Sequence, residues 1–190
     1  MTLVTKIWWV RHLPIDLPEH LEGCYIGQTD VEAVIPPTRT ELELLPEQAL
    51  WFSSPLKRAK ATAEWLGARN LQLAPELKEQ YFGTWEGKAY DQVWGEAQHL
   101  DWEKPELIKP PQGESFMELC ERVGAWLDTA LKHYDGQNLI IVSHAGVIRA
   151  GLKHALGMRP SEVLSTDLNY ASVTQVSYSD TFAIADYINR

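Results

Sequence analysis

The chain has 190 residues, 45% of them hydrophobic, and 17 Lys and Arg against 26 Asp and Glu give a formal net charge of −9. This size and apolar content predict a single globular domain over residues 1–190. The acidic surface disfavours nucleic acids and anionic membranes, so we expect neither as a partner. A site for an anionic substrate must therefore concentrate its positive charge in a pocket.

The sequence favours a soluble protein of the cytoplasm. No apolar run approaches the roughly 20 residues that span a bilayer, and Lys6 interrupts the apolar start, so no signal-peptide pattern is recognised. Cys24 and Cys120 are too few for a disulfide framework and predict free thiols. We expect no metal and no cofactor, because four histidines lack acidic or cysteine partners at metal-ligand spacing: His20, His99, His133 and His154. A homodimer is left open.

In the first half of the chain, two apolar runs predict strands at residues 7–10 and 49–53. Between them, residues 13–37 form a long connection rich in Pro, Gly and acidic residues, which is typical of a functional or disordered loop. A helix is predicted over residues 55–69, with Ser54-Pro55 as its N-cap and first residue.

In the second half, helical spacing of apolar residues predicts helices at 90–100, 114–134 and 147–156. Residues 102–113, with three prolines, form a second irregular stretch. Strands are predicted at 139–143, 172–177 and 182–188, the last two as an edge hairpin that turns at Ser179-Asp180. Alternating strands and helices predict an α/β fold, a three-layer α/β/α sandwich with a mainly parallel sheet.

Chemically useful side chains gather where predicted strands end. Arg11-His12 follows the first strand, Arg58 lies in the first turns of the helix after the second, and His144 follows the strand at 139–143. In an open α/β sheet, ligands bind at the carboxyl ends of the strands. A lone histidine there is more often structural and a lone arginine is more often a solvated charge. The conjunction of these segments favours a phosphate site.

These residues suit phosphoryl transfer. A neutral imidazole can attack phosphorus and form a phosphohistidine, which divides one difficult displacement into two. Arg11, Arg58 and a protonated His144 would stabilise charge on the phosphoryl oxygens without a metal. A glutamic acid near the phosphate can protonate the leaving alkoxide and afterwards activate water.

Four segments resemble motifs of one family. They are Arg11-His12, residues 53–63 (SSPLKRAKATA), residues 77–87 (LKEQYFGTWEG) and residues 143–149 (SHAGVIR). In this order they are similar to the histidine phosphatase superfamily, and the resemblance covers nearly the whole chain. It implies a single histidine phosphatase domain with a phosphoglycerate mutase-like fold.

The resemblance also implies roles for particular residues. His12 would be the nucleophile and Glu79 the acid and base, while Arg11, Arg58 and His144 would bind the phosphoryl group. Two further residues are expected to bind substrate, Gln28 and Ala145. The substrate would be a small phosphorylated metabolite.

Residues 11–16 and 24–30 resemble the alpha-ribazole phosphatase branch, which acts in assembly of the cobalamin lower ligand. The chain departs from the family pattern at Leu13, where a glycine is common, and lacks the asparagine that often follows. Residues 34–37 and 40–46 leave room for little more than one turn of the usual first helix.

Other functions stay open at this point. They are a phosphatase of another small metabolite, a phosphoglycerate mutase-like phosphotransferase, and a non-catalytic module that binds phosphate esters. An aromatic leaving group could stack on Trp85, Trp94 or Trp102, but ordinary packing is the interpretation that we favour for these rings.

Overall fold

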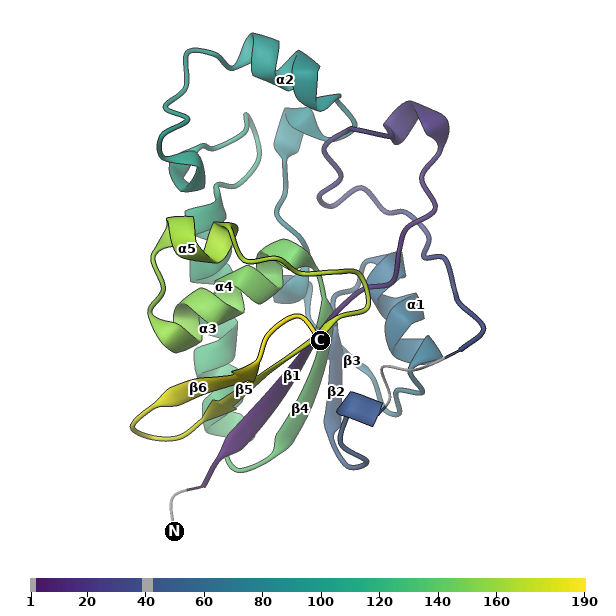
Figure 1. Ribbon diagram of the computed structural model, residues 1–190, viewed down its shortest axis with the longest axis vertical. Helices are drawn as coiled ribbons and strands as arrows, with labels where there is room; N and C mark the ends of the chain where they lie inside the picture. Colours follow the sequence, from purple (N-terminus) through teal and green to yellow (C-terminus); the bar gives the residue numbers. More distant parts are fainter. Residues whose placement is uncertain (1–2, 39–42) are drawn as a thin grey trace.

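The computed structural model describes residues 3–38 and 43–190. Its sheet has the strand order β3-β2-β4-β1-β5-β6 (Figure 1). The strands are β1 (Thr5–Arg11), β2 (Leu50–Ser53), β3 (Gln72–Leu73), β4 (Asn138–Ser143), β5 (Val173–Tyr178) and β6 (Ala183–Tyr187). The first four are parallel to their neighbours, whereas β5 is antiparallel to β1 and β6 to β5. The predicted mainly parallel sheet with an edge hairpin is therefore confirmed.

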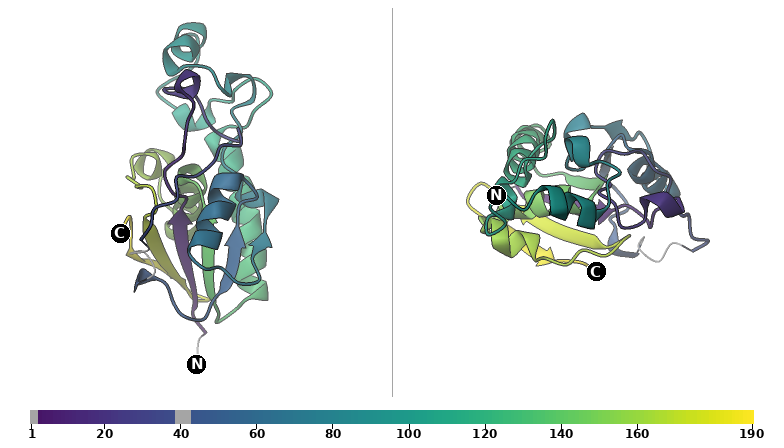
Figure 2. Two further views of the ribbon diagram at one scale, coloured as in Figure 1. Left: turned by 90° about the vertical axis from the view of Figure 1, so that its right-hand side faces the viewer. Right: turned by 90° about the horizontal axis from the view of Figure 1, so that it is seen from above.

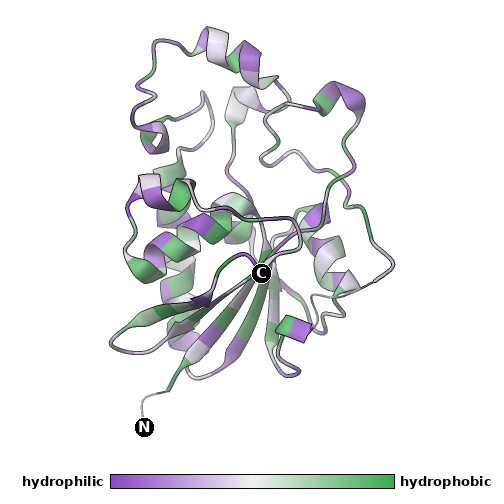
Figure 3. Ribbon diagram, viewed as in Figure 1, coloured by the Kyte–Doolittle hydropathy of each residue, from purple (hydrophilic) through white to green (hydrophobic). Residues whose placement is uncertain are grey.

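Helices cover both faces of the sheet, which gives three layers (Figures 1 and 2). Helix α1 (Lys57–Trp65) packs on one face, and α3 (Phe116–His133), α4 (Ala145–Leu156) and α5 (Pro160–Leu164) lie on the side of the other. Helix α2 (Tyr90–Glu96) lies beyond the strand ends. Trp9 and Ile141 pack on the α3 and α4 side, and their strand neighbours Trp8 and Ile140 pack on the α1 side. Successive strand residues face opposite sides, so both faces must carry apolar residues. Green, hydrophobic stretches lie between paler and purple ones along the strands in Figure 3. The predicted α/β/α sandwich is confirmed.

The start of α1 differs from the prediction. Leu56, which has no polar side chain, is the N-cap, and the helix begins at Lys57 rather than at Pro55. Ser54 is not the N-cap; its hydroxyl instead contacts His144, 2.8 Å from Nε2. By contrast, Ser115 and Glu118 form a capping box at the start of α3, close to the predicted boundary.

Two short elements escaped the sequence analysis. Strand β3 has two residues, both exposed, so it carries no apolar run. Helix α5 begins at Pro160 and has five residues, too few to show a helical period. The expected turn near residues 40–46 falls partly on residues 39–42, outside the described residues. Cys24 and Cys120 are free, as predicted.

The parallel strands end on the side of the molecule where two long connections lie. Figures 1 and 2 show residues 13–37 and the segment that carries α2 beyond the carboxyl ends of β1, β2 and β4. Isolated bridges join the two connections, Cys24 to Ala89 and Tyr25 to Glu86. The two connections form walls around the sheet edge at which the sequence predicted a phosphate site. Within the described residues, no helix is long and apolar enough to cross a bilayer.

Candidate active site

A cavity of about 430 Å³ opens at this sheet edge. Four of the five residues that we expected to be catalytic line it, because each lies at or just after the carboxyl end of β1 or β2, or in the loop after β3. The lining consists of Arg11, His12, Ile15, Leu17, Gly23, Cys24, Tyr25, Ile26, Arg58, Glu79, Phe82, Tyr90 and Tyr170.

His12 is held as a neutral imidazole with a defined tautomer. Its side chain is buried, and Nδ1 lies 2.7 Å from the carbonyl oxygen of Leu13. A carbonyl only accepts, so Nδ1 carries the proton and Nε2 keeps its lone pair. Burial and the charges of Arg58 and Arg11 lower the pKa of His12 to about 3, against the opposing hydrogen bond to Leu13. A nucleophile is thereby ready at neutral pH.

His144 lies behind His12, with their ring centroids 5.1 Å apart. Its side chain is completely buried, and Nδ1 has no hydrogen-bond partner among the described residues. Burial, followed by the charge of Arg58, lowers the pKa of His144 well below 6.5. This shift favours a neutral His144 in the protein by itself, whereas the sequence analysis expected a protonated His144 around a phosphoryl group, because sequence spacing does not report burial. A dianionic phosphoryl group would oppose both causes of the shift.

Two guanidinium groups flank His12. Arg58 is buried and donates to the carbonyl oxygens of Thr29 and Gly27, at 2.9 and 2.6 Å. Arg11 lies with its guanidinium carbon 3.9 Å from the centre of the Tyr170 ring. Burial lowers the pKa of both arginines, and the negative charge of Glu79 opposes this. Because arginine stays charged in proteins, the cavity holds the concentrated positive charge that an acidic chain needs for an anionic ligand.

Glu79 projects into the cavity from the loop after β3. Its Oε1 accepts from the backbone N–H of Gln80 at 2.9 Å, and Oε2 accepts from the N–H of Gly146 at 3.2 Å. Gly146 lies in the first turn of α4, where free N–H groups favour a carboxylate. A carboxyl group is thus positioned beside the two arginines and His12.

The comparisons with known proteins agree with this geometry. The profile of the histidine phosphatase superfamily (branch 1) matches residues 38–189, which include Arg58, Glu79 and His144. The chain belongs to this superfamily. Arg11 and His12 precede the matched residues.

Relatives within the superfamily differ in their named substrates. The chain is 32% identical over 145 residues to a bifunctional protein of Mycobacterium tuberculosis, covering 73% of this chain and 40% of that one. It is 27% identical to the adenosylcobalamin/alpha-ribazole phosphatase of Salmonella typhimurium, over 97% of this chain and 96% of the relative. A mycobacterial glucosyl-3-phosphoglycerate phosphatase has a similar fold, with a TM-score of 0.81 and 22% identity over 98% of this chain and 99% of that one.

Aromatic rings that the sequence analysis missed form much of this histidine phosphatase's cavity wall. Tyr25, Phe82, Tyr90 and Tyr170 line it, and the Tyr170 ring lies 5.4 Å from the His12 ring. The described lining residues do not include Trp85, Trp94 or Trp102. Trp85 and Trp102 belong instead to a small apolar cluster around Val93, and the Trp94 ring lies 5.0 Å from the Trp102 ring. No local pattern marks these tyrosines, which come from three separate segments.

Glu86 is a second residue that the sequence analysis did not single out. Its carboxylate accepts from the backbone N–H groups of Gly27, Gln28, Thr29 and Phe82 and from the Thr29 hydroxyl. The loop that it holds supplies the two carbonyls that bind Arg58. Glu86 therefore orients Arg58 through the backbone. Gly27 is required there, because a Cβ atom would overlap Gln80 O and the Glu86 carboxylate.

Gln28 and Ala145, which we expected to bind substrate, are outside the described lining of the cavity. The Gln28 side chain instead donates to the carbonyl oxygen of Glu79 at 3.0 Å. Ala145 is the first residue of α4. His144 is likewise behind the wall rather than in it. Among the described residues, no three His, Cys, Asp or Glu side chains cluster as metal ligands would.

The lowered pKa of His12 predicts a pH-dependent stability. In the unfolded chain the imidazole protonates as the pH falls below 6.5, whereas in the folded protein it stays neutral down to about pH 3. Between these two pH values the unfolded state binds more protons than the folded state. The free energy of unfolding therefore falls by about 1.4 kcal/mol for each unit by which the pH is lowered. Urea unfolding at several pH values should show a shallower fall for His12→Gln than for the unchanged protein. Equal slopes would mean that His12 is not held neutral.

The close approach of Glu79 to α4 predicts an effect of Gly146→Ala. A Cβ atom at this position would overlap Oε1 of Glu79 and displace the carboxyl group. We expect kcat for an alkyl phosphate to fall roughly 10- to 100-fold, because misplacement of a reacting group by about 1 Å has this cost. Gly95→Ala in α2 is the control, since nothing lies within 4 Å of its added Cβ. Unchanged kcat in Gly146→Ala would contradict the placement.

Proposed function

We propose that this protein is a phosphomonoesterase that needs no metal and works through a phosphohistidine at His12. The observation that carries the proposal is the neutral His12 with its Nδ1–H bound to Leu13 O, in one cavity with Arg11, Arg58 and Glu79. A deprotonated ring nitrogen, two fixed cations and a carboxyl group are what phosphoryl transfer to nitrogen requires.

In the first step, Nε2 of His12 forms a bond to phosphorus as the bond from phosphorus to the ester oxygen breaks. The electron pair of that bond passes to the ester oxygen, which takes a proton from the carboxyl group of Glu79. Arg11 and Arg58 stabilise the charge on the remaining phosphoryl oxygens. The alcohol then leaves.

In the second step, the carboxylate of Glu79 takes a proton from water as the water oxygen bonds to phosphorus. The bond between nitrogen and phosphorus breaks, its electron pair returns to Nε2, and inorganic phosphate leaves. His12 is neutral again and Glu79 is protonated again, so the cycle closes. Two guanidinium groups supply the charge stabilisation that a metal supplies in other phosphatases.

We propose alpha-ribazole 5′-phosphate as the substrate. Its leaving group is a neutral nucleoside with an aromatic base, and the cavity offers four aromatic rings together with Ile15, Leu17 and Ile26. The only Lys or Arg side chains among the described lining residues are Arg11 and Arg58, which both serve the phosphoryl group. Similarity over nearly the full length to the Salmonella typhimurium phosphatase supports the same choice.

Charged leaving groups fit this cavity less well. A phosphoserine or phosphoglycerate phosphatase would have to pair a carboxylate, and a mutase would have to hold a second phosphate. A module that only binds phosphate esters would not need a nucleophile with a low pKa beside an acid. Measuring the turnover of different phosphate esters distinguishes these alternatives.

The first test measures hydrolysis of alpha-ribazole 5′-phosphate, O-phosphoserine, 3-phosphoglycerate and glucosyl-3-phosphoglycerate in EDTA. We expect EDTA-resistant turnover with kcat/KM highest for alpha-ribazole 5′-phosphate. Even turnover of the panel would retain the phosphatase and reject the cobalamin assignment. Binding of the esters without turnover would reject the enzyme.

A matched pair of aromatic residues on α2 tests the leaving-group wall. Tyr90 and Trp94 are similarly exposed, 56% and 53%, but only Tyr90 lines the cavity. Tyr90→Leu should lower kcat/KM for alpha-ribazole 5′-phosphate roughly 5-fold, because an aromatic pair contributes about 1 kcal/mol beyond burial. Trp94→Leu should leave it unchanged. Equal effects of the two changes would remove Tyr90 from substrate recognition.

A further inference from the structure

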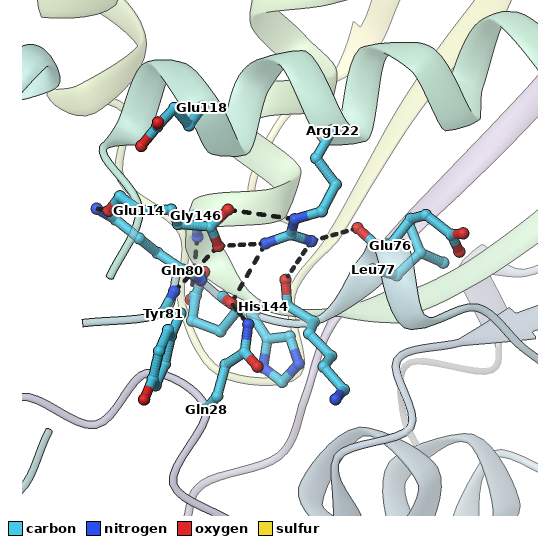
Figure 4. A network of polar contacts seen from close by, with 12 residues as sticks. Gln28, Glu76, Leu77, Gln80, Tyr81, Glu114, Glu118, Arg122, His144 and Gly146 are labelled. Carbon is cyan, nitrogen blue, oxygen red and sulfur yellow. Dashed lines mark hydrogen bonds and ion pairs between the residues drawn. The ribbon is translucent and has the colours of Figure 1, made fainter. Parts of the chain in front are cut away.

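Arg122 on α3 makes an unusual set of contacts with the loop that carries Glu79. Its guanidinium donates to the backbone carbonyl oxygens of Glu76, Lys78 and Glu79, at 2.5, 3.1 and 3.5 Å. It also pairs with the carboxylate of Glu114, at 2.5 Å from Nη2 and 3.3 Å from Nε. Figure 4 shows the side chain reaching from α3 between Glu114 on one side and Glu76 on the other.

Glu114 extends the same network to the residues after Glu79. Its Oε1 accepts from the backbone N–H of Tyr81 at 3.0 Å, and its carbonyl oxygen accepts from the Gln80 side chain at 2.9 Å (Figure 4). Arg122 thus holds the backbone up to Glu79, and Glu114 holds the two residues that follow. The loop is therefore tied on both sides of the candidate acid, by Arg122 on α3 and by Glu114 just before the N-cap of that helix.

The contacts are specific to a guanidinium group. Its planar fork donates in several fixed directions, whereas an ammonium group is a point charge. The side chains of Arg122 and Glu114 are 24% and 18% exposed, against 55% and 40% for the ion pair between Lys109 and Glu118, of which Glu118 lies on α3. An exposed ion pair contributes little to stability. The main contribution of Arg122 is therefore to fix the three backbone carbonyl groups that it binds.

Arg122 does not reach the reacting groups itself. The described residues that line the cavity include Glu79 but neither Arg122 nor Glu114. Without Arg122, three carbonyl oxygens and one carboxylate would lose a charged donor, and the loop would be free to move. The carboxyl group of Glu79 would then lose its fixed distance to the ester oxygen.

We propose that Arg122 and Glu114 form a clamp that positions Glu79 for proton transfer to the leaving group. Both are positioning residues, and the inference rests on the acid role of Glu79 in the proposed function. The clamp acts on the step in which the alkoxide needs a proton. It makes no contact with His12, the nucleophile of that step.

The test compares benzyl phosphate, whose alkoxide needs a proton, with p-nitrophenyl phosphate, whose phenolate leaves without one. In single-turnover measurements, which report the first step alone, Arg122→Met should slow release of benzyl alcohol roughly 10- to 100-fold and release of p-nitrophenolate less than about 3-fold. Arg122→Lys, which retains the charge but not the fork, should show most of the same loss. Lys109→Met, which removes the exposed ion pair of α3, should change neither rate.

A double-mutant cycle shows whether Arg122 acts through Glu79. In a Glu79→Gln background, Arg122→Met should cause no further loss with benzyl phosphate. Equal losses on both substrates, full rescue by Arg122→Lys, or an additive loss in the cycle would overturn the clamp. Melting temperatures confirm folding, and if Arg122→Met does not fold, Arg122→Lys and Glu114→Gln provide the same comparison.

The two proposals fail in different ways. If Glu79→Gln slows benzyl phosphate selectively but Arg122→Met does not, only the clamp is rejected. If Glu79→Gln slows both substrates equally, Glu79 is not the acid, and the clamp is rejected together with that role.

Discussion

Replacing His12 with Ala should lower kcat for phosphomonoesters roughly 10⁴-fold or more, the scale seen when a covalent nucleophile is removed. The fold should survive. The His12 ring makes a local polar contact, with the carbonyl oxygen of Leu13. His12 follows the end of β1 and does not fill the apolar core. The change also removes a histidine that the folded state must hold neutral. The melting temperature should therefore fall little.

Acid-labile labelling measures the intermediate directly. After brief mixing with a ³²P-labelled substrate and a denaturing quench at alkaline pH, the unchanged protein should retain label and His12→Ala should retain none. His99→Ala is the control, since His99 is exposed on the segment after α2. Retained label in His12→Ala would place the phosphorylated residue elsewhere and reject the mechanism.

Replacing Glu79 with Gln should lower kcat roughly 10²- to 10⁴-fold for benzyl phosphate, because the alkoxide loses its proton source. The amide keeps the size of the side chain and can still accept from the N–H of Gly146, so the cavity should keep its shape. For p-nitrophenyl phosphate the loss in the first step should be small. Single-turnover rates of benzyl alcohol and p-nitrophenolate release provide the comparison, because they exclude the hydrolysis of the phosphohistidine that both esters share.

The control for this change is Glu76→Gln. The Glu76 side chain is exposed on the same loop and does not line the cavity. The substitution therefore removes a similar charge away from the site. Its rates should equal those of the unchanged protein. A Glu79→Gln variant that lost the same factor with both esters would assign the carboxyl group to positioning, not to leaving-group protonation.

Much of the fold and of the site was predictable because both depend on local patterns. Apolar runs buried on both faces marked β1, β2 and β4, and each is followed at once by a polar residue. Parallel strands meet at one edge, so His12 and His144 had to come together once the sheet was recognised. The elements that were missed, β3 and α5, are too short to show a period.

The state of His144 was not predictable from its place after β4. Spacing brought it to the phosphate site as an expected cation, but complete burial beside Arg58 lowers its pKa. Burial depends on how α4, β1 and the loops close around the ring. The ionisation state of His144 is therefore determined by the packing around it and not by its position in the sequence.

By itself, the sequence determined the α/β sandwich, the sheet edge and the family, because hydrophobic period and motif spacing are local features that survive in one dimension. Only the tertiary structure decided the rest: the neutral tautomer of His12, the aromatic wall with Tyr25, Tyr90 and Tyr170, and the hold of Arg122 on the Glu79 loop. These depend on residues far apart in the chain, whose distances, burial and hydrogen bonds exist only after folding. No pattern in the chain order records them.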